Sequence, residues 1–431
     1  MLFNKARRVL AVTLAAGMAA LSLTACGGAS DTTADGKTRL DFYYPINVGG
    51  PLEAVVNGFV EDFEAENPDI DVTPVYSGDY NQTVAAVKAA IDGGEAPAAA
   101  VLMSAELKTM NDEGLIQPIS ELTDDTEWLN SFHPAFLANS TLDGKVASIP
   151  FQRSTVVQIW NKDHFKQAGL DPEVPPQTWD ELVTMGKQLK EKSDTTWAVQ
   201  LPSDYPNGAW IFQALTLQNG LKLDNEEGTE VKFNDPKSVE AVKFLQKLTD
   251  EGVQQPGTVA WGTLPNEFTA GNASIIWTTT GQLSNIRKNA NFDFGVSILQ
   301  QNEQFGTPTG GGNYYVLADA SDKQKEAAVK FAKFLTDPQR QAEWTVASGY
   351  VAPSDAAWQT QTLKDYVADF PQAYVAYQQL EYAQAELSPY RRGAVEQAIA
   401  DALAAAMNGT SAEDATKQGQ EQIDGILRDY Q

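Results

Sequence analysis

The spacing of apolar residues predicts alternating strands and helices in the first part of the chain. Residues 52, 55, 56, 59, 60 and 63 are apolar, which is the pattern of an amphipathic helix over Leu52–Glu66. Apolar and polar residues alternate over Ile70–Tyr76, as they do in a half-buried strand. A strand at 40–45, a helix at 82–91 and an apolar strand at 98–103 complete the series. This alternation predicts an α/β lobe with a largely parallel sheet.

A second unit with a similar alternation begins at Ile149. Thr178 is expected to cap a helix that begins at Trp179. Further strands are expected at 156–160, 275–279 and 314–317, with a glycine-rich break at 306–312. Further helices are expected at 164–168, 209–218, 236–251, 264–270 and 323–335. From Pro371 to the end the pattern is helical.

Residues 1–25 have the pattern of a secretory signal peptide. A basic start that contains Arg7 and Arg8 precedes an apolar run over Val9–Leu23. The run is shorter than the roughly 18 residues that a membrane-spanning helix needs. The following Leu23–Cys26 segment resembles the bacterial lipobox, in which the chain is cut before the cysteine and the thiol is acylated. The alternative is an ordinary signal peptide with an idle cysteine.

Residues 26–38 are expected to form a lipidated cysteine and a flexible tether. The segment is rich in Gly, Ser, Thr, Ala and Asp, a composition typical of flexible linkers. Several acyl chains on Cys26 would anchor the protein stably. We therefore expect the body of the protein at the extracellular face of the cytoplasmic membrane.

Charge and cysteine content exclude several classes of partner. The 431 residues include 31 Lys and Arg against 57 Asp and Glu, a formal net charge of −26. So acidic a chain is a poor partner for nucleic acid, because phosphate backbones bind basic surfaces. One cysteine excludes a disulfide framework, and two histidines leave little for a histidine-rich metal site. No cofactor or metal is expected. The length indicates two or more lobes, and a monomer is expected.

Several segments resemble the extracellular solute-binding proteins of ABC importers, in the carbohydrate-type group. The densest match covers Pro150–Thr155, Trp160–Asp163, Ala168–Pro172 and Pro175–Trp179. Tyr76–Gln82 is similar to a segment of the subgroup that binds sn-glycerol 3-phosphate. The resemblance extends over residues 39–431. It implies an α/β fold of two lobes with a hinge and a central cleft, in which closure of the lobes captures the ligand.

The resemblance also implies that both lobes are discontinuous. The N-terminal lobe is expected to contain residues 39–149 plus 312–357. The C-terminal lobe is expected to contain residues 150–311 plus 358–431. The chain would then cross between the lobes near residues 150, 312 and 358.

The resemblance implies five binding residues whose side chains carry no charge. Tyr80 matches a tyrosine that contacts the ligand, and Trp179 matches a tryptophan that packs on the ligand carbons. Ser154 and Thr280 match small hydroxyl groups that bind the ligand. Gly311, between two other glycines, would let backbone N–H groups approach an anion. Without the resemblance, each residue has an ordinary structural role as its alternative, and Trp179 would belong to the core.

Tyr350 and Arg391 carry the expectation of a phosphate site. A guanidinium is a permanently charged fork that fits phosphate oxygens, and a phenol adds a neutral donor. The alternative for Arg391 is a solvated helix charge paired to Glu386 or Glu396. The neighbouring Arg392 leaves the choice of arginine open by one position.

The chain departs from the subgroup at Ser104. The subgroup has there a glutamate that accepts the glycerol hydroxyls, and the register places Ser104, not Glu106, at that position. A serine binds two adjacent hydroxyls weakly, so a glycerophosphodiester or a sugar becomes an alternative to sn-glycerol 3-phosphate. The neighbour of Ser154, Arg153, is a second departure that could add a positive contact.

The sequence favours a binding protein over an enzyme. It contains no Gly-x-Ser-x-Gly elbow, no phosphate-binding Walker loop and no His-Glu-x-x-His motif. A solute-binding protein that delivers its ligand to the permease subunits of an ABC importer is therefore expected. A secreted hydrolase of glycerophosphodiesters or glycans is the alternative enzyme class, and a surface adhesin is the third alternative.

Overall fold

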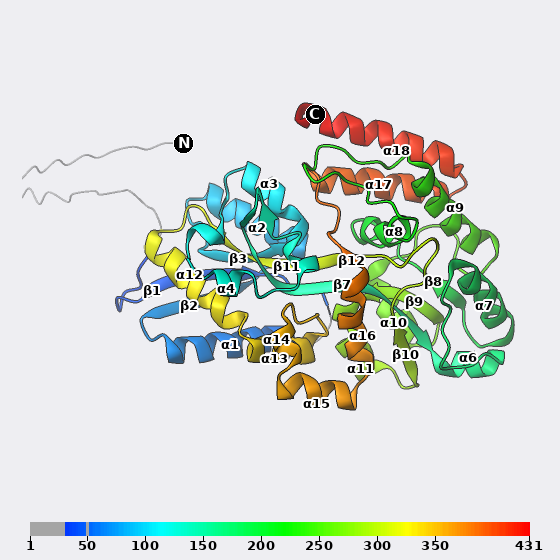
Figure 1. Cartoon of the computed structure of the whole chain (residues 1–431), viewed down its shortest axis with the longest axis horizontal. Coiled ribbons are helices and arrows are strands. Elements are labelled where there is room, and N and C mark those ends of the chain that lie inside the picture. Colours follow the sequence, from blue (N-terminus) through cyan, green and yellow to red (C-terminus); the bar gives the residue numbers. More distant parts are fainter. Residues whose placement is uncertain (1–30, 49–50) are drawn as a thin grey trace, which may run out of the picture.

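The computed structural model describes residues 31–48 and 51–431 (Figure 1). The predicted signal peptide and Cys26 lie outside the described residues. Within the described ranges, no helix is long and apolar enough to cross a membrane.

The first half of the molecule has the predicted parallel strands. The central strand β1 (Thr38–Tyr44) pairs in parallel with β2 (Ile70–Tyr76) and with β3 (Ala99–Met103). The apolar faces of α1 and α12 pack on one side of this sheet, and α2 and α3 cover the other. The bounds of these helices are α1 (Leu52–Glu66), α2 (Tyr80–Asp92), α3 (Leu107–Asp112) and α12 (Asp322–Leu335). Helices on both faces of a parallel sheet confirm the α/β class for this half.

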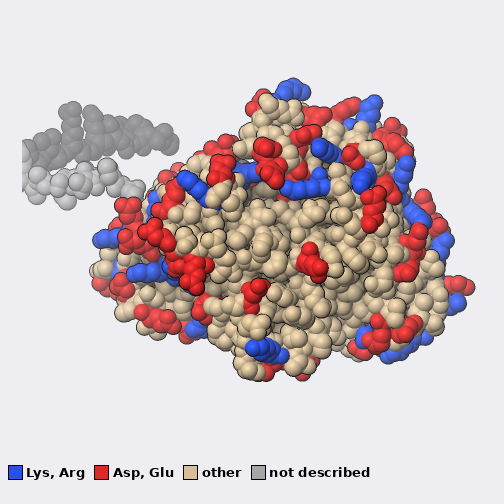
Figure 2. Space-filling view, viewed as in Figure 1, with Lys and Arg blue, Asp and Glu red and all other residues tan. Residues whose placement is uncertain are grey.

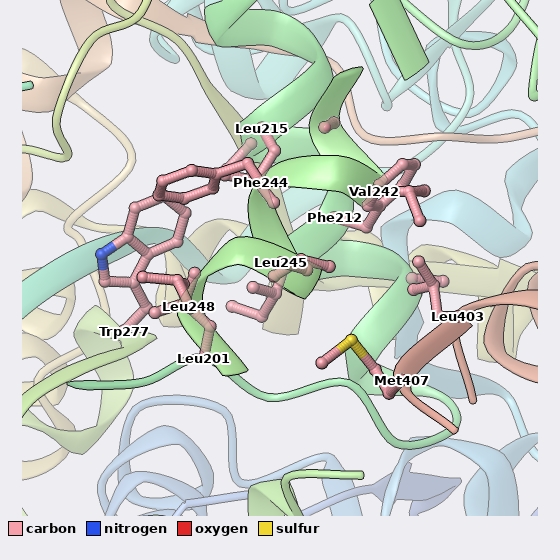
Figure 3. Packing of buried hydrophobic residues seen from close by; sticks show 14 of the residues in the cluster. Leu201, Phe212, Leu215, Val242, Phe244, Leu245, Leu248, Trp277, Leu403 and Met407 are labelled. Carbon is pink, nitrogen blue, oxygen red and sulfur yellow. The ribbon is translucent and has the colours of Figure 1, made fainter. Parts of the chain in front are cut away.

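The second half contains the largest hydrophobic core. Strand β9 (Ala273–Thr279) pairs in parallel with β8 (Trp197–Gln200), and helices surround the two. Figure 3 shows part of this core, where Phe244 lies near Leu215 and Trp277. The other elements of the second half are α6 (Lys162–Ala168), α7 (Trp179–Lys192), α8 (Asn207–Gln218), α9 (Pro236–Asp250), η3 (Trp261–Thr263), α10 (Leu264–Thr269), η4 (Thr280–Gln282), α11 (Leu283–Asn289) and β10 (Phe294–Ser297).

Two long antiparallel strands connect the halves. Strands β7 (Ile149–Asn161) and β11 (Thr307–Leu317) run across the middle of the molecule (Figure 1). Strand β7 packs at its start in the core of the first half, through Ile149, and later in the core of the second half, through Val156. The sheet order β2-β1-β3-β11-β7-β9-β8 is therefore continuous. The predicted crossing points near residues 150 and 312 fall within these strands, and the lobe boundaries themselves stay a prediction.

The glycine-rich segment at 306–312 is not a break. Most of it belongs to β11, where Gly310 pairs with Ser154 and Gly312 pairs with Met103 of β3. The expectation of a break was wrong because a glycine in a strand also marks a place where other groups approach the backbone closely.

Shorter elements complete the two halves. Most of them lie between β3 and β7 or follow α12. They are η1 (Ser104–Glu106), β4 (Ile116–Gln117), η2 (Ile119–Glu121), α4 (Thr126–Leu129), α5 (Pro134–Leu137), β5 (Thr141–Leu142), β6 (Lys145–Val146), α13 (Pro338–Ser348), α14 (Asp355–Trp358) and α15 (Gln361–Asp369).

The C-terminal region is helical only in part. Helix α16 (Gln372–Gln378) and the turn η5 (Gln379–Tyr382) are followed by the two-residue strand β12 (Ala383–Gln384). No regular structure is then formed up to α17 (Arg392–Met407), which precedes α18 (Ala412–Leu427) and η6 (Arg428–Tyr430). The expectation of continuous helix was wrong here because Pro389 lacks an N–H and disfavours helix at the residue before it.

The surface carries charges of both signs. On the face shown in Figure 2, acidic and basic side chains are interspersed around the margin, and the middle is largely uncharged. No continuous basic area covers this face, which fits the net charge of −26.

Candidate ligand-binding pocket

A pocket lies between the two halves, at the ends of β3 and β9 and beside the crossing strands. It contains about 490 Å³ of space that no atom fills, a figure that includes open solvent. The first half contributes Asn47, Val48, Tyr80, Met103 and Tyr350. The crossing strands contribute Ser154 and Gly311. The second half contributes Pro206, Asn207, Trp210, Trp261, Thr279, Glu386, Arg392 and Glu396.

Two tryptophans form an aromatic corner of the pocket. Trp210 lies in the first turn of α8 and Trp261 begins η3; their rings meet edge to face with centroids 5.9 Å apart. The Nε1–H of Trp210 donates to the carbonyl oxygen of Thr309 at 2.7 Å. A Cβ on Gly310 would lie 2.6 Å from the indole, so glycine is needed where Trp210 rests on β11. Such faces pack well on the C–H groups of a polyol or a cation.

Two tyrosines of the first half also line the pocket. Tyr80 begins α2, whose N-terminus is fixed by the capping residue Asp79. The Tyr80 hydroxyl donates to Oε1 of Gln152 at 3.1 Å and lies 3.4 Å from the hydroxyl of Tyr350. Burial raises the pKa of Tyr80 well above its ordinary value and that of Tyr350 to about 12. Both phenols are therefore neutral hydrogen-bonding groups at neutral pH.

Gly311 has a conformation that other residues rarely adopt. Its φ is +90°, and a Cβ there would lie 1.9 Å from the carbonyl oxygen of Gln152. At Gly312 a Cβ would lie 2.8 Å from the ring of Tyr80. The glycines thus bring β11 close to β7 and leave room for Tyr80. Contact of the Gly311 N–H with an anion stays a prediction.

Arg392 is the cation of the pocket, and two carboxylates already hold it. Its Nε and Nη2 donate to Oε1 of Glu106 at 2.8 and 2.6 Å, and its Nη1 donates to Oε2 of Glu396 at 2.6 Å. The Arg392 side chain is only 2% exposed. Burial acts against its charge, but Glu106 and Glu396 outweigh burial and raise the pKa of Arg392 above its ordinary value. Because Glu106 lies on η1 and Arg392 on α17, this ion pair joins the two halves across the pocket.

Glu386 adds a third carboxylate. It lies in the irregular segment before α17, and its Oε1 accepts a hydrogen bond from the hydroxyl of Ser104. Burial raises the pKa of Glu386 to about 7, against the opposing effect of Arg153. Arg153 itself is fully buried, and its Nη1 donates to Oδ1 of Asn313 at 3.0 Å.

A family model described as bacterial extracellular solute-binding protein matches residues 58–372. The chain belongs to this family. Among its relatives, the sn-glycerol-3-phosphate-binding periplasmic protein of Pectobacterium atrosepticum is 28% identical over 400 residues, which cover 88% of this chain and 86% of the relative. The protein of that name from Salmonella typhimurium is 29% identical over 364 residues, 80% of each chain. The resemblance inferred from the sequence is confirmed.

Solved structures of solute-binding proteins confirm the two-lobed fold. UgpB from Mycobacterium tuberculosis, in complex with glycerophosphocholine, has a TM-score of 0.80 at 23% identity and covers 92% of this chain and 100% of its own. The cyclic alpha-maltosyl-1,6-maltose binding protein of Arthrobacter globiformis has a TM-score of 0.79 at 22% identity, with 91% and 100% covered. At 22–23% identity these likenesses establish the fold and not the ligand.

Four predicted site residues line the pocket of this solute-binding protein, namely Tyr80, Ser154, Gly311 and Tyr350. Ser104 is fully buried beneath the pocket and reaches it through its hydrogen bond to Glu386. These residues lie where the resemblance placed them, and their contact with a ligand stays a prediction.

Trp179 lies outside the pocket. It stacks on Phe244 of α9 with ring centroids 4.2 Å apart, and its Nε1–H donates to Oε1 of Gln218 at 2.6 Å. The expectation that it packs on ligand carbons is corrected: its indole belongs to the core of the second half. The first residue of α7 faces inward because it lies on the same helical face as the buried Leu182, Val183, Gly186 and Leu189.

Thr280 and Arg391 each stand one position from a residue that lines the pocket. Thr280 is fully buried, and its Oγ1 accepts the backbone N–H of Thr155 at 3.3 Å, while Thr279 lines the pocket. Arg391 is exposed, with a φ of 53° that ends the irregular segment, and Arg392 turns inward in the first turn of α17. At both places the residue that lines the pocket is the neighbour of the predicted one, Thr279 and Arg392, and their contact with a ligand stays a prediction.

The sequence analysis missed the aromatic corner and the pairing of Arg392. Trp210 has a signal in the sequence, because it stands among apolar residues four positions after Pro206 and faces the glycines of β11. Glu106 and Glu396 have no such signal. Their approach to Arg392 depends on how the two halves meet.

Proposed function

We propose that the protein is the substrate-binding component of an ABC importer and that it captures a glycerophosphodiester or sn-glycerol 3-phosphate. The single observation that supports this most is Arg392, a buried guanidinium that lines the pocket beside an aromatic corner. A guanidinium suits phosphate oxygens, and the indoles of Trp210 and Trp261 suit the apolar and cationic parts of such ligands. Relatives named for sn-glycerol 3-phosphate, and a structural neighbour holding glycerophosphocholine, support the same ligand class.

The charge balance favours the diester over the monoester. Arg392 is already shared by Glu106 and Glu396, and Glu386 adds a further carboxylate to the pocket lining. A phosphate monoester carries nearly two negative charges at neutral pH and a diester carries one. Repulsion by the carboxylates therefore opposes the monoester more strongly.

A neutral sugar is the second candidate ligand. The edge-to-face pair of Trp210 and Trp261, with the polar groups of Asn47 and Asn207, would suit a sugar ring without any phosphate. The structural neighbour that binds a cyclic maltose derivative supports this alternative. In either case the ligand would leave the protein chemically unchanged, because the proposed role is binding and delivery to the permease. A hydrolase of glycerophosphodiesters or glycans is the enzyme alternative.

The proposal includes the membrane anchor predicted from the sequence. Cleavage after residue 25 and acylation of Cys26 would tether a monomer to the extracellular face of the cytoplasmic membrane. Metabolic labelling with a palmitate analogue would test this, with Cys26→Ser as the control that loses the label. A protein that is secreted without label would contradict the anchor and leave the binding role intact.

Titration calorimetry tests the ligand. The purified protein is titrated with sn-glycerol 3-phosphocholine, sn-glycerol 3-phosphate and maltose, and the recovered ligand is analysed by chromatography. We expect the phosphocholine diester to bind most tightly and to be recovered intact. Binding of maltose alone would replace the phosphate proposal by the sugar candidate, and a cleaved ligand would favour the hydrolase.

A further inference from the structure

The backbone around Glu386 is held by both halves of the molecule. Its N–H donates to Oδ1 of Asn139 at 2.9 Å, and its carbonyl oxygen accepts from Nδ2 of the same residue at 3.1 Å. The next N–H, of Leu387, donates to Gln213 in the second half. Ser388 donates through its hydroxyl to the carbonyl oxygen of Ala105, on η1. An irregular segment fixed at so many points can present one side chain in a defined orientation.

The carboxylate of Glu386 has one oxygen in use and one available. Ser104 donates to Oε1, while Oε2 accepts no hydrogen bond from the residues that the structure describes. Among the described residues, Oε2 is not one of the fully buried polar atoms without a partner, and Glu386 borders both this pocket and a second hollow beside α3 and β5. Glu386 lines the pocket together with Arg392 and Glu396, the charges that act on its carboxyl group. Among the described residues, Oε2 is therefore the oxygen of Glu386 that is left to accept a hydrogen bond from a ligand in the pocket.

Ser104 determines which oxygen stays available. Its hydroxyl is fully buried and donates to Oε1 alone. A ligand that carries two adjacent hydroxyl groups can donate both to a carboxylate, and such charge-assisted bonds are stronger than bonds between neutral groups. The phosphate of a diester has no hydrogen-bond donor to offer, and its negative charge would be repelled at the same place.

We propose that Glu386 is the residue that accepts the hydroxyl groups of the ligand, with Ser104 as its positioning residue. This assignment rests on the proposed function, because it takes the glycerol hydroxyls of a glycerophosphodiester, or those of a sugar, as the groups that bind. It places the specificity for hydroxyl groups on the irregular segment before α17, in the second half of the pocket.

The experiment compares two ligands that differ only in the hydroxyl groups. Calorimetry measures the Kd of sn-glycerol 3-phosphocholine and of propylphosphocholine, which lacks the two glycerol hydroxyls, for the wild type and for Glu386→Gln. We expect the substitution to weaken the first ligand about tenfold and to leave the second unchanged or tighter. Glu381→Gln, an exposed change five residues earlier, is the matched control and should affect neither ligand.

Each outcome decides between the assignment and the proposed function. Equal Kd values of sn-glycerol 3-phosphocholine for the wild type and Glu386→Gln would overturn the assignment alone. A wild type that binds only maltose would overturn the phosphate ligand, and the assignment would then stand or fall by the Kd of maltose in Glu386→Gln. A wild type that binds none of the three would overturn both.

The pH dependence of binding gives a second readout that a merely structural role would not produce. Burial raises the pKa of Glu386 to about 7, so the affinity for sn-glycerol 3-phosphocholine should rise with pH through this value and be flat for Glu386→Gln. Neither the phosphodiester nor choline titrates near pH 7.

The charged and titratable groups that face Glu386 come from four elements and are Tyr80, Arg153, Tyr315, Arg392 and Glu396.

A second variant, Ser104→Ala, tests the assignment without changing Glu386 itself. Ser104→Ala removes the hydroxyl that orients Glu386 and keeps the carboxylate itself. The Kd of sn-glycerol 3-phosphocholine should increase about threefold, and that of propylphosphocholine should not change. An equal change for both ligands would show that Ser104 acts on the pocket as a whole and would contradict its positioning role.

Discussion

The two sides of the pocket differ in how they are built and in what they carry. The side formed by the first half, through Tyr80 and Tyr350, is neutral, and its hydroxyl groups contact each other and Gln152. The side formed by the second half carries Glu386, Arg392 and Glu396. The neutral side resembles the lining of many polyol sites. The charged side selects ligands by their charge.

The charged side is also the side that depends on closure. Arg392 makes two hydrogen bonds to Glu106, on η1 of the first half, and this pairing exists only while the halves are together, whereas its pairing with Glu396 lies within α17. Tyr80 and Tyr350 belong instead to the core of their own half. Substitutions on the charged side should therefore alter stability and binding together, and those on the neutral side should alter binding more selectively.

The largest effect is expected for Arg392→Gln. It leaves Glu106 and Glu396 buried without their cation, which costs roughly 3–5 kcal/mol of unfolding free energy, and it removes the proposed phosphate contact. Chemical denaturation and calorimetry with sn-glycerol 3-phosphocholine measure the two effects. Arg391→Gln is the control, because the exposed Arg391 should leave both values at the wild-type level. The reverse ranking of the two arginines would show that the wrong one has been placed in the pocket.

The next largest effect is expected for Trp179→Ala and concerns stability alone. Loss of the indole that stacks on Phe244 should lower the free energy of unfolding by roughly 3–5 kcal/mol, as for other large core side chains. The Kd of the folded variant should stay within twofold of the wild type, since Trp179 does not line the pocket. Denaturant titration and calorimetry on the folded fraction measure both. A large increase in Kd with an unchanged free energy of unfolding would show that Trp179 contacts the ligand.

Tyr80 and Tyr350 on the neutral side were predicted through the family resemblance and not through local pattern. The structure then gives a local reason for the place of Tyr80, which follows the capping residue Asp79 at a helix start. The order of strands and helices was predictable from the sequence itself, since apolar periodicity and caps act over a few residues. The length of strand β7 was underestimated from the sequence. Its polar residues are buried where the two halves meet, so they do not show a strand pattern.

The charged side could not be predicted in the same way. Which of Arg391 and Arg392 faces inward depends on where α17 begins, and Pro389 and the left-handed Arg391 set that start. Trp179 and Trp210 both follow a proline-containing loop at the start of a helix, and only the packing of α7 and α8 distinguishes core from pocket. Contacts between residues almost 300 positions apart, such as Arg392 with Glu106, leave no local pattern.

Trp210→Ala tests the aromatic corner, with a smaller effect that should appear in binding. Removing the indole exposes the ligand to water and leaves Trp261 without its partner ring, so the Kd should increase about 10- to 100-fold, or roughly 1.4–2.8 kcal/mol. Tyr76→Ala, an exposed aromatic on β2, is the matched control. Calorimetry with sn-glycerol 3-phosphocholine and maltose measures the change, and an unchanged Kd for both would exclude the corner from ligand contact.

The smallest effect tests the place where the two sides meet, at Glu386 and Ser104. Burial raises the pKa of Glu386 from 4.5 to about 7, so the folded state binds its proton more tightly than the unfolded state. This contribution to stability is complete below pH 4.5 and is lost as the pH rises through about 7. Glu386→Gln cannot titrate, and the free energy of unfolding of the variant relative to the wild type should therefore increase from pH 5 to pH 8, by on the order of 1–2 kcal/mol.

Denaturant titrations of both proteins at pH 5 and pH 8 measure this difference, with Glu381→Gln as the variant that should show none. A difference that stays constant over this range would mean that Arg153 and the hydroxyl of Ser104 keep Glu386 ionised throughout. The charged side would then carry the ionised Glu386 at every pH from 5 to 8. In that case its preference for a neutral or zwitterionic ligand would not change with pH, and the contrast with the neutral side would be permanent.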